Sequence, residues 1–469
     1  MGDLHLKSAF ELANLIRKRE VKPSEAVADS LARVEALNPR LNAFCALRAG
    51  QAMDDARALD EKIARRESLG PLAGVPFGVK DLEDVSGMAT TFGSVPFKNN
   101  IATRDAIQVA RLRAAGAIVI GKTNTPEFGS KAFTRNLLFG VTRSPWNPEL
   151  TPGGSSGGSS AAVAAAMVPL ATASDMGGSI RLPAAFTGCV GLKPSHGRIP
   201  AGPRLGMPGF NDLAVVGPIS RTVRDAALYM DAVIGYDPLD ADSLPHPGIS
   251  YLTFLEHCPR RLRIAFHPDF GRPVQRDIMR EVAAAADVFR ALGHEVVTLE
   301  EAVPDTRDGW ASMVAAQSLA SLGEYVEHHR GEFGRAFVSG LEAAAKITWK
   351  DYGTAQRVRA RFNQWVAEIF RRYDLLLSPT MPIEAFPAEG PPPLEIEGVR
   401  IADYMDTLPF TYPFNLSGHP AISVPAGFTD RGLPCAIQIV AERHRDDLVL
   451  AAAYAFEVAR PWNDKWPIP

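Results

Sequence analysis

Hydrophobic positions along the chain follow two periods, one typical of helices and one typical of buried strands. Val27, Leu31 and Val34 recur at intervals of three and four residues, which predicts a helix over 24–37. The mostly apolar run over 74–81 is short and ends in a lysine and an aspartate, as a buried strand often does. The two patterns recur along the whole chain.

End signals bound the other predicted elements. The helix over 24–37 is predicted to end before Pro39, and glycines and capping residues limit the rest. Further helices are predicted at 8–20, 51–66, 105–116, 222–234, 274–292 and 447–459, and 307–372 is almost wholly helical with breaks at Gly323, Gly331 and Gly340. Further strands are predicted at 43–47, 117–120, 262–266, 295–299, 375–378, 421–425 and 436–440.

The alternation of helices and strands predicts an α/β fold. We expect a single large domain over 1–469, built on a central mixed, mostly parallel twisted β-sheet that is covered by helices on both faces. The proline-rich stretches 237–248 and 387–393 are predicted as surface loops, the second of them over a pocket.

Composition narrows the class of protein. Hydrophobic residues make up 46% and charged residues 22% of the chain, as in an ordinary globular protein. The net charge of −3 argues against a nucleic acid partner. The start of the chain has no apolar signal segment, and no charge-free apolar run is long enough to span a membrane, so we expect a cytoplasmic protein.

The cysteines give no sign of a metal site or a disulfide framework. They lie far apart in sequence and form no pair separated by two residues. The four are Cys45, Cys189, Cys258 and Cys435. We therefore expect a reducing compartment, no metal and no cofactor.

Two glycine-rich turns stand close together in the stretch 153–194. A glycine-serine loop covers 153–160, and after an apolar run a second tight turn covers 175–179. Glycine costs backbone entropy when it is ordered, but it lets several N–H groups point at one spot. Two serine hydroxyls and a set of amides that face a common point are the layout of acyl-transfer chemistry.

Three better-known serine or phosphate motifs do not fit this stretch. Gly153–Gly157 matches the nucleophile elbow G-x-S-x-G, but the elbow must follow a strand, and the prolines of 146–152 rule a strand out. No Gly-Lys-Ser/Thr follows the loop, so it is not a nucleotide phosphate loop. Ser-x-x-Lys occurs nowhere in the chain, which excludes the β-lactamase arrangement.

The runs GGSSGGS and DMGGSIRLPAAFTGCVGLKPS, with GVPFGVKD upstream, resemble the amidase signature family. The resemblance covers most of the chain and implies a Ser–cis-Ser–Lys triad. By motif, the nucleophile falls on Ser179, the cis-serine on Ser155 and the lysine on Lys80. Met176 departs from the family pattern, where a small β-branched residue is common, but only its backbone N–H is expected to matter.

The resemblance assigns further roles around the triad. The backbone N–H groups of Met176, Gly177, Gly178 and Ser179 would stabilise an oxyanion. Ser156 is expected within the hydroxyl relay, and Asp175 and Arg181 are expected to hold the turn as an ion pair. Candidates for the substrate pocket are Glu127, Phe128 and Gly129. The catalytic core is expected at about 70–220, and a helical region at about 300–400 is expected to shape the pocket.

A lysine can replace histidine as the base only when its amine is neutral. No histidine lies inside either glycine-rich turn. Lowering the pKa of a lysine from about 10.4 to near neutrality costs on the order of 4 kcal/mol, and burial in the apolar run that holds Lys80 is the means. Activity is then expected to rise with pH as the ammonium loses its proton.

These features together predict a serine hydrolase of small, aryl or linear amides, with activity extending to esters and carbamates, as in a urethanase. The expected partner is a small-molecule substrate, and the expected state is a monomer or homodimer. Two alternatives stay open: a glutaminyl amidotransferase A-type subunit, and a non-catalytic ligand-binding protein on the same fold.

Overall fold

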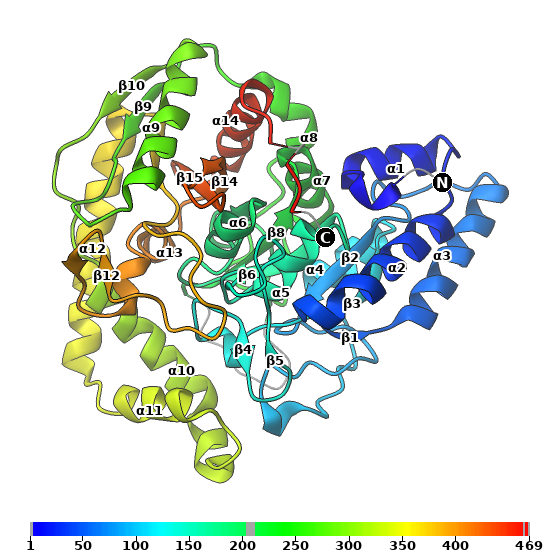
Figure 1. Ribbon diagram of the computed structural model, residues 1–469, viewed down its shortest axis with the longest axis horizontal. Helices are drawn as coiled ribbons and strands as arrows, with labels where there is room; N and C mark the ends of the chain where they lie inside the picture. Colours follow the sequence, from blue (N-terminus) through cyan, green and yellow to red (C-terminus); the bar gives the residue numbers. More distant parts are fainter. Residues whose placement is uncertain (1–2, 203–211, 463–464, 468–469) are drawn as a thin grey trace.

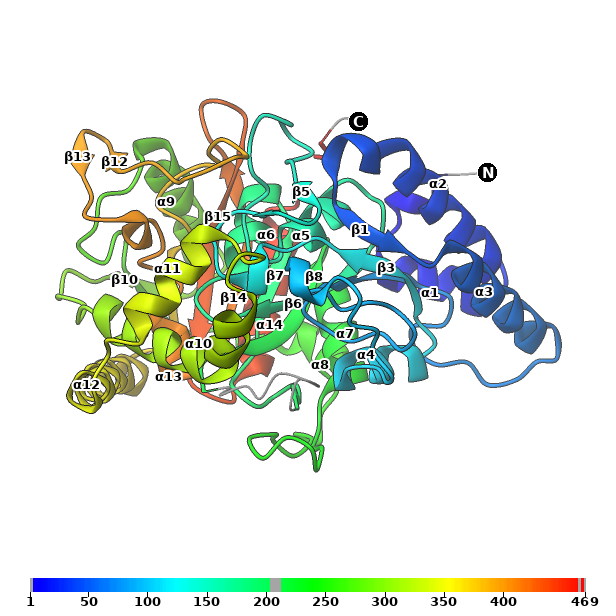
Figure 2. The ribbon, with the colours of Figure 1, turned by 90° about the horizontal axis from the view of Figure 1, so that it is seen from below.

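A computed structural model describes residues 3–202, 212–462 and 465–467 of the chain. Its centre is an eleven-stranded sheet in the order β1-β3-β2-β6-β8-β7-β14-β15-β11-β9-β10. Helices cover both faces of the sheet, so the predicted α/β class is confirmed (Figure 1). The N-terminal helices α1, α2 and α3 lie at one end of the molecule, and α10, α11 and α12 lie at the other (Figure 2).

The sheet is mixed, as predicted. It is not mostly parallel, as we expected, because antiparallel pairs outnumber parallel ones. Four of its ten neighbouring strand pairs are parallel and six are antiparallel. β14 and β15, for example, are joined by a turn of five residues, which only an antiparallel pair allows. The strands are β1 (Phe44–Leu47), β2 (Pro76–Lys80), β3 (Ile118–Thr123), β6 (Leu170–Asp175), β7 (Val190–Lys193), β8 (Val215–Ser220), β9 (Arg263–Phe266), β10 (Glu295–Thr298), β11 (Leu375–Pro379), β14 (Ala421–Phe428) and β15 (Pro434–Ala441). Two small hairpins pair β4 (Arg135–Asn136) with β5 (Gly140–Val141) and β12 (Glu395–Ile396) with β13 (Val399–Arg400).

Alternate residues of each buried strand pack against different helix layers. One layer contains α1 (Ala9–Arg17), α4 (Ile107–Ala114), α7 (Val223–Val233), α8 (Tyr251–Phe254), α9 (Arg276–Ala291) and α14 (Asp446–Ala459). The other contains α2 (Pro23–Leu41), α3 (Ala49–Ala64), α5 (Gly157–Ala164), α6 (Arg181–Thr187), α12 (Trp349–Arg372) and α13 (Pro413–Ser417). Near the end of the sheet lie α10 (Arg307–His329) and α11 (Arg335–Ala344).

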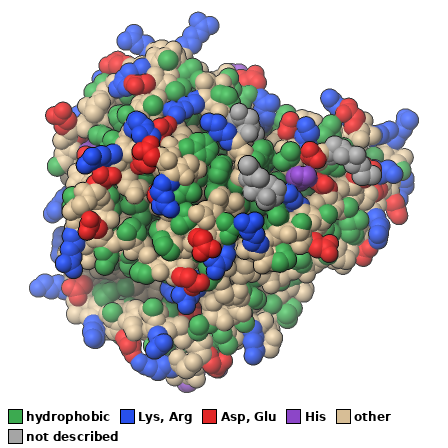
Figure 3. Space-filling view, viewed as in Figure 1, with side chains coloured by type: hydrophobic (Ala, Val, Ile, Leu, Met, Phe, Trp, Pro, Cys, Tyr) green, Lys and Arg blue, Asp and Glu red, His purple; other side chains and the backbone are tan. Residues whose placement is uncertain are grey.

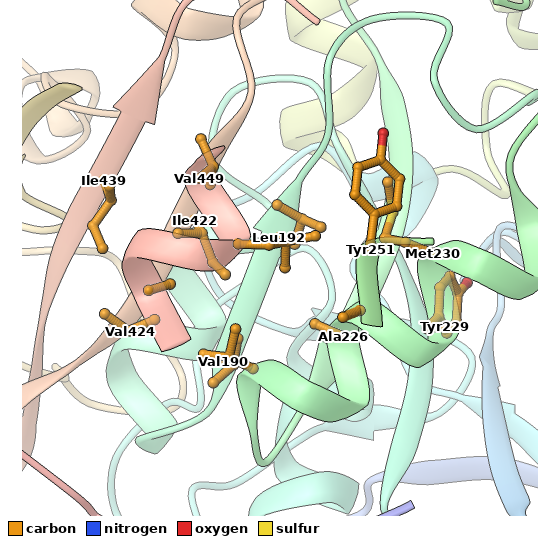
Figure 4. Packing of buried hydrophobic residues seen from close by; sticks show 14 of the residues in the cluster. Val190, Leu192, Ala226, Tyr229, Met230, Tyr251, Ile422, Val424, Ile439 and Val449 are labelled. Carbon is orange, nitrogen blue, oxygen red and sulfur yellow. The ribbon is translucent and has the colours of Figure 1, made fainter. Parts of the chain in front are cut away.

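The largest apolar cluster fills the space between the sheet and the first of these layers. Val190 and Leu192 of β7 meet Ile422 and Val424 of β14 there, and Ala226 of α7 closes the cluster (Figure 4). Burial of such side chains is the main stabilising contribution to the fold. Val79 of β2 and Leu170 of β6 belong to the same cluster, and these two strands carry the site described below.

Three local predictions were wrong for physical reasons. α2 continues through Pro39 to Leu41, because one lost hydrogen bond in the last helical turn does not end a helix. Gly323 and Gly340 lie inside α10 and α11, because packing outweighs the cost of about 1 kcal/mol for a helical glycine. Only Gly331 falls between helices.

The surface shown in Figure 3 carries basic and acidic side chains in close alternation, with apolar side chains between them. No region of one charge sign dominates this face, as expected for a net charge of −3. Within the described ranges, none of the helices combines the length and the hydrophobicity that a membrane crossing needs.

Candidate active site

Strand β2 carries Lys80 to the centre of the molecule. The side chain is fully buried, and its backbone N–H donates to Thr172 Oγ1 of the neighbouring parallel strand β6, at 3.0 Å. Its Nζ lies 2.8 Å from Ser155 Oγ and 3.0 Å from Ser174 Oγ. The Ser174 carbonyl accepts a longer contact from the same Nζ at 3.4 Å. The amine is therefore held among hydroxyl groups of two different segments.

Ser155 lies in the loop before α5, and the Gly154–Ser155 peptide bond is cis, as the family resemblance implied. Gly154 packs so closely on the preceding loop that an added Cβ would lie 2.7 Å from the Lys131 carbonyl oxygen. The predicted glycine-serine loop is shorter than expected, because α5 already begins at Gly157. A Cβ added to Gly157 would also collide, because it would lie 2.2 Å from Thr134 Oγ1.

Ser156 links the two glycine-rich turns. Its N–H donates to the Ser179 carbonyl at 3.3 Å, and its hydroxyl contacts the Ser174 carbonyl at 3.4 Å. The side chain is fully buried. The structure thus joins the loop of Ser155 to the turn of Ser179, and both to strand β6.

Ser179 itself is only half-buried, at the tip of the turn that follows β6. Two glycines let neighbouring groups approach this turn. An added Cβ on Gly177 would lie 2.5 Å from the Trp310 ring, and one on Gly178 would lie 2.5 Å from Thr411 Oγ1. Trp310 Nε1 also donates to the Met176 carbonyl at 2.8 Å. The turn is therefore packed from the side of α10.

One of the four expected oxyanion donors is already engaged. The Gly178 N–H donates to Asp175 Oδ1 at 2.7 Å, since the carboxylate folds back over the turn. The N–H groups of Met176, Gly177 and Ser179 have no acceptor within the part of the chain that the structure describes. These three groups are the ones left to face a ligand.

Asp175 and Arg181 form the expected ion pair, with both side chains fully buried. Arg181 Nε and Nη2 donate to the two carboxylate oxygens at 3.0 and 2.9 Å. Burial alone would raise the pKa of Asp175, but the charge of Arg181 and hydrogen bonds from Arg181 and Asn415 hold it well below its ordinary value. The ion pair therefore holds the turn 175–179 in place.

The remaining donors of Arg181 reach segments far along the chain. Nη1 donates to the Thr411 carbonyl and to Gln438 Oε1, both at 2.8 Å. Nη2 donates to Asn415 Oδ1 at 2.7 Å, and Asn415 Nδ2 donates in turn to Asp175. Removing one partner of such a buried, hydrogen-bonded ion pair would strongly destabilise the fold, because the remaining charge would be left unpaired.

Sequence reasoning missed five residues of this site: Thr172, Ser174, Trp310, Thr411 and Asn415. Ser174 could have been found, because it directly precedes Asp175 on a strand that points at the turn. Asn415 lies on the short helix α13, 240 residues after Asp175. Nothing in the local pattern indicates Trp310 or Thr411, since their role depends on contacts across more than 130 residues.

The three residues predicted to line the substrate pocket lie in different surroundings in the structure. Gly129 lies against the Ser155 hydroxyl, because a Cβ added to it would lie 3.0 Å from Ser155 Oγ. Phe128 turns into an aromatic cluster, stacked on Phe337 of α11 with ring centroids 4.8 Å apart. Glu127 is buried and accepts hydrogen bonds from Ser94 Oγ at 2.8 Å and the Gly334 N–H at 3.0 Å. Burial raises the pKa of Glu127, although these hydrogen bonds oppose the rise.

Replacing Gly129 by alanine is expected to reduce kcat/KM by about 100-fold, because the new methyl group displaces Ser155 Oγ from Lys80. Gly129 has φ +70°, so the change also costs about 1–2 kcal/mol of backbone strain. Gly140→Ala is the matched control, since Gly140 has φ +82° and no atom within 4 Å of its added Cβ. Equal loss of activity in both variants would show that strain, not contact with Ser155, is responsible.

A hydrogen bond and an ion pair hold the proline-rich loop 387–393 against neighbouring segments. The Ala388 N–H donates to the Glu149 carbonyl at 3.0 Å, and Glu389 pairs with Arg135 at 3.3 Å. A Cβ added to Gly390 would lie 2.5 Å from the ring of Phe133. The loop thus covers the segment that packs on Gly154.

Another fully buried lysine lies near the turn. Lys193 ends strand β7, and its Nζ donates to the Pro194 carbonyl at 3.0 Å. Burial and the charge of Arg181 lower its pKa to about 7, while Asp175 and Asp446 oppose the shift.

This lysine makes stability depend on pH. The unfolded chain, where lysine has its ordinary pKa of 10.5, binds more protons than the folded chain between about pH 7 and 10.5. Stability is therefore expected to rise with pH across this window, by up to about 1.4 kcal/mol per pH unit from this group. Denaturant unfolding at several pH values checks this. Lys193→Met should flatten the slope, and an unchanged slope in the variant would contradict the assignment.

Within the described residues, no three side chains from histidine, cysteine, aspartate and glutamate come together as metal ligands would. What the site does hold is an amine, several hydroxyls and three turn amides that have no acceptor among the described residues. A hydroxyl whose proton can pass to an amine is a nucleophile, and the amides can stabilise an oxyanion. This arrangement is suited to acyl transfer.

Comparison with known proteins agrees with this chemistry. The family model described as Amidase matches residues 25–450. An acylamidase from Rhodococcus erythropolis is 39% identical over 99% of this chain and 98% of its own. The A-type subunit of the glutamyl-tRNA(Gln) amidotransferase from Geobacillus kaustophilus (strain HTA426) is 36% identical over 98% of this chain and 99% of its own. A solved bacterial aryl acylamidase of the amidase signature family superposes with a TM-score of 0.92 at 34% identity, covering 98% of both chains.

Proposed function

The chain belongs to the amidase signature family of amidohydrolases, and we propose that it cleaves the C–N bond of small, aryl or linear amides through an acyl-enzyme on Ser179. The observation that carries the proposal is the 2.8 Å contact between Lys80 Nζ and Ser155 Oγ, in a loop bonded to the turn of Ser179. It supports a relay of protons from serine to serine to lysine.

In the proposed reaction, Ser179 Oγ attacks the amide carbonyl while its proton passes to Ser155 Oγ. Ser155 gives its own proton to the neutral amine of Lys80, which becomes an ammonium. The relay then runs backwards and protonates the leaving amine, so the C–N bond breaks and the acyl-enzyme remains. Water, deprotonated by the same relay, attacks the ester and releases the acid and Ser179.

The oxyanion formed in each attack is proposed to bind the N–H groups of Met176, Gly177 and Ser179. In other enzymes the loss of one such donor costs roughly 3–4 kcal/mol of transition-state stabilisation. We propose that the buried Asp175–Arg181 pair holds the turn in place during the reaction. Preorganised donors of this kind account for much of the rate enhancement in acyl transfer.

The proposed preference for aryl or linear amides rests on relatives and on the lining of the site. An acylamidase and an aryl acylamidase are among the similar proteins. Trp310 and Tyr412, with ring centroids 5.5 Å apart, pack beside the turn. Esters and carbamates carry similar carbonyl groups, so we propose that the same serine attacks them as well.

The amidotransferase proteins among the relatives make the A-type subunit the second candidate. Hydrolysis of an anilide, an ester and a carbamate by the chain purified alone tests the first candidate against it. A fluorophosphonate probe followed by peptide mass spectrometry should place a covalent adduct on Ser179. Activity that appears only with a partner protein would favour the second candidate, and absence of any adduct would favour a non-catalytic binding protein.

A further inference from the structure

Helix α10 carries a buried amide group that has no hydrogen-bond partner. The side chain of Gln317 is 4% exposed. Neither its Nε2 nor its Oε1 meets a donor or an acceptor among the residues that the structure describes. An unmet buried polar group is costly and uncommon, so it calls for a partner that comes from elsewhere.

Gln317 lies on the same face of α10 as Trp310 and Met313. It lies seven residues after Trp310, which is about two turns, so the two side chains share a face about 10 Å apart. Trp310 donates to the Met176 carbonyl, and Met313, one turn before Gln317, is buried in the cluster that includes Met176. This face of α10 thus packs both on the turn of Ser179 and on α12, since Ala355 belongs to the cluster of Met313.

The next part of α10 reaches the other side of the same centre. Leu322 packs in the apolar cluster with Leu82 and Phe92, and Phe128 packs against that cluster. The neighbouring residue Gly129 faces Ser155 Oγ. Along α10, Gln317 thus stands between Met313, which packs near the turn of Ser179, and Leu322, which packs near Phe128.

We propose that Gln317 binds a second amide-like group of the substrate, one that has both a carbonyl and an N–H. This inference rests on the proposed function, in which the carbonyl under attack is bound by the turn amides. The amide of Gln317 offers one acceptor and two donors, which match the N–H and carbonyl of an amide, carbamate or urea. Substrates with two such groups are favoured over those with one.

Two series of anilides with equal acyl length test the proposal. One series carries an internal amide at successive positions of the acyl chain, and the other has only methylene groups there. The natural chain is expected to prefer the best internal amide in kcat/KM. Gln317→Leu is expected to reduce that preference about tenfold or more, mainly through KM, because two hydrogen bonds are lost.

Stability separates this role from a structural one. If the amide has no partner in the protein, Gln317→Leu raises the midpoint of thermal unfolding while it lowers the preference. Gln356→Leu on α12 is the control: Gln356 already bonds the Tyr352 hydroxyl, so the preference should stay unchanged.

Three results would overturn the inference. They are a lower unfolding midpoint in Gln317→Leu, an unchanged preference in that variant, and the same loss of preference in Gln356→Leu. In each of these cases the natural chain still hydrolyses anilides, so the proposed function is not affected. If the natural chain hydrolyses no anilide, the proposed function fails, and the inference fails with it.

Discussion

Replacing Ser179 by alanine is expected to abolish amide hydrolysis, with a loss in kcat on the order of 10⁶-fold, as removal of the nucleophile causes in other serine hydrolases. The reason is that no acyl-enzyme can form without the hydroxyl at the tip of the turn. Steady-state rates with an anilide, and mass spectrometry of the protein after exposure to a fluorophosphonate, measure both effects.

Ser160→Ala is a suitable control for this variant. Ser160 lies in the same glycine-serine stretch, but among the described residues its hydroxyl bonds only the carbonyls of Pro152 and Gly157. It should keep its activity and its covalent adduct. An adduct on another serine in Ser179→Ala, together with full activity, would contradict the assignment of the nucleophile.

Replacing Lys80 by methionine is expected to lower kcat by about 10²- to 10⁴-fold, the usual contribution of a general base. Methionine keeps most of the volume of the buried stem and removes the amine that contacts Ser155 and Ser174. The residual activity should also lose the acidic limb of the pH–rate profile. Rates measured across pH for both proteins check the two effects together.

Lys122→Met shows what loss of a buried lysine does when the lysine is structural. Lys122 lies on the neighbouring strand, fully buried, and pairs with Asp81 at 3.1 Å. Breaking such a pair costs about 3–5 kcal/mol of stability. Lys80→Met should instead lose rate with a nearly unchanged unfolding midpoint. A wild-type rate in Lys80→Met, or a rate loss that only follows unfolding, would refute the relay.

Much of the site could be predicted because its parts are local. The run that ends in Lys80 and Asp81 has the composition of a buried strand, and it is β2. The glycines near Ser155 and Ser179 mark turns that other groups approach closely: an added Cβ would meet backbone atoms at Gly154 and the Trp310 ring at Gly177. Such conformational preferences belong to a few consecutive residues.

Other predictions failed where packing outweighs local preference. Gly178 was expected among the oxyanion donors, but its N–H is held by Asp175. Pro39 was expected to end a helix that continues past it. In each case the deciding partner or neighbour could not be seen in the local pattern.

The amino-acid sequence alone determined the class of fold, the two tight turns and the residue types that could carry acyl transfer. The tertiary structure alone decided that Lys80 contacts Ser155, that Gly129 faces the same hydroxyl, and that Arg181 bonds groups 230 to 257 residues further along the chain. The physical reason is the separation along the chain over which each kind of interaction acts. Backbone preferences act between neighbours in sequence, whereas a hydrogen bond about 3 Å long between distant segments depends on the order in which strands join the sheet.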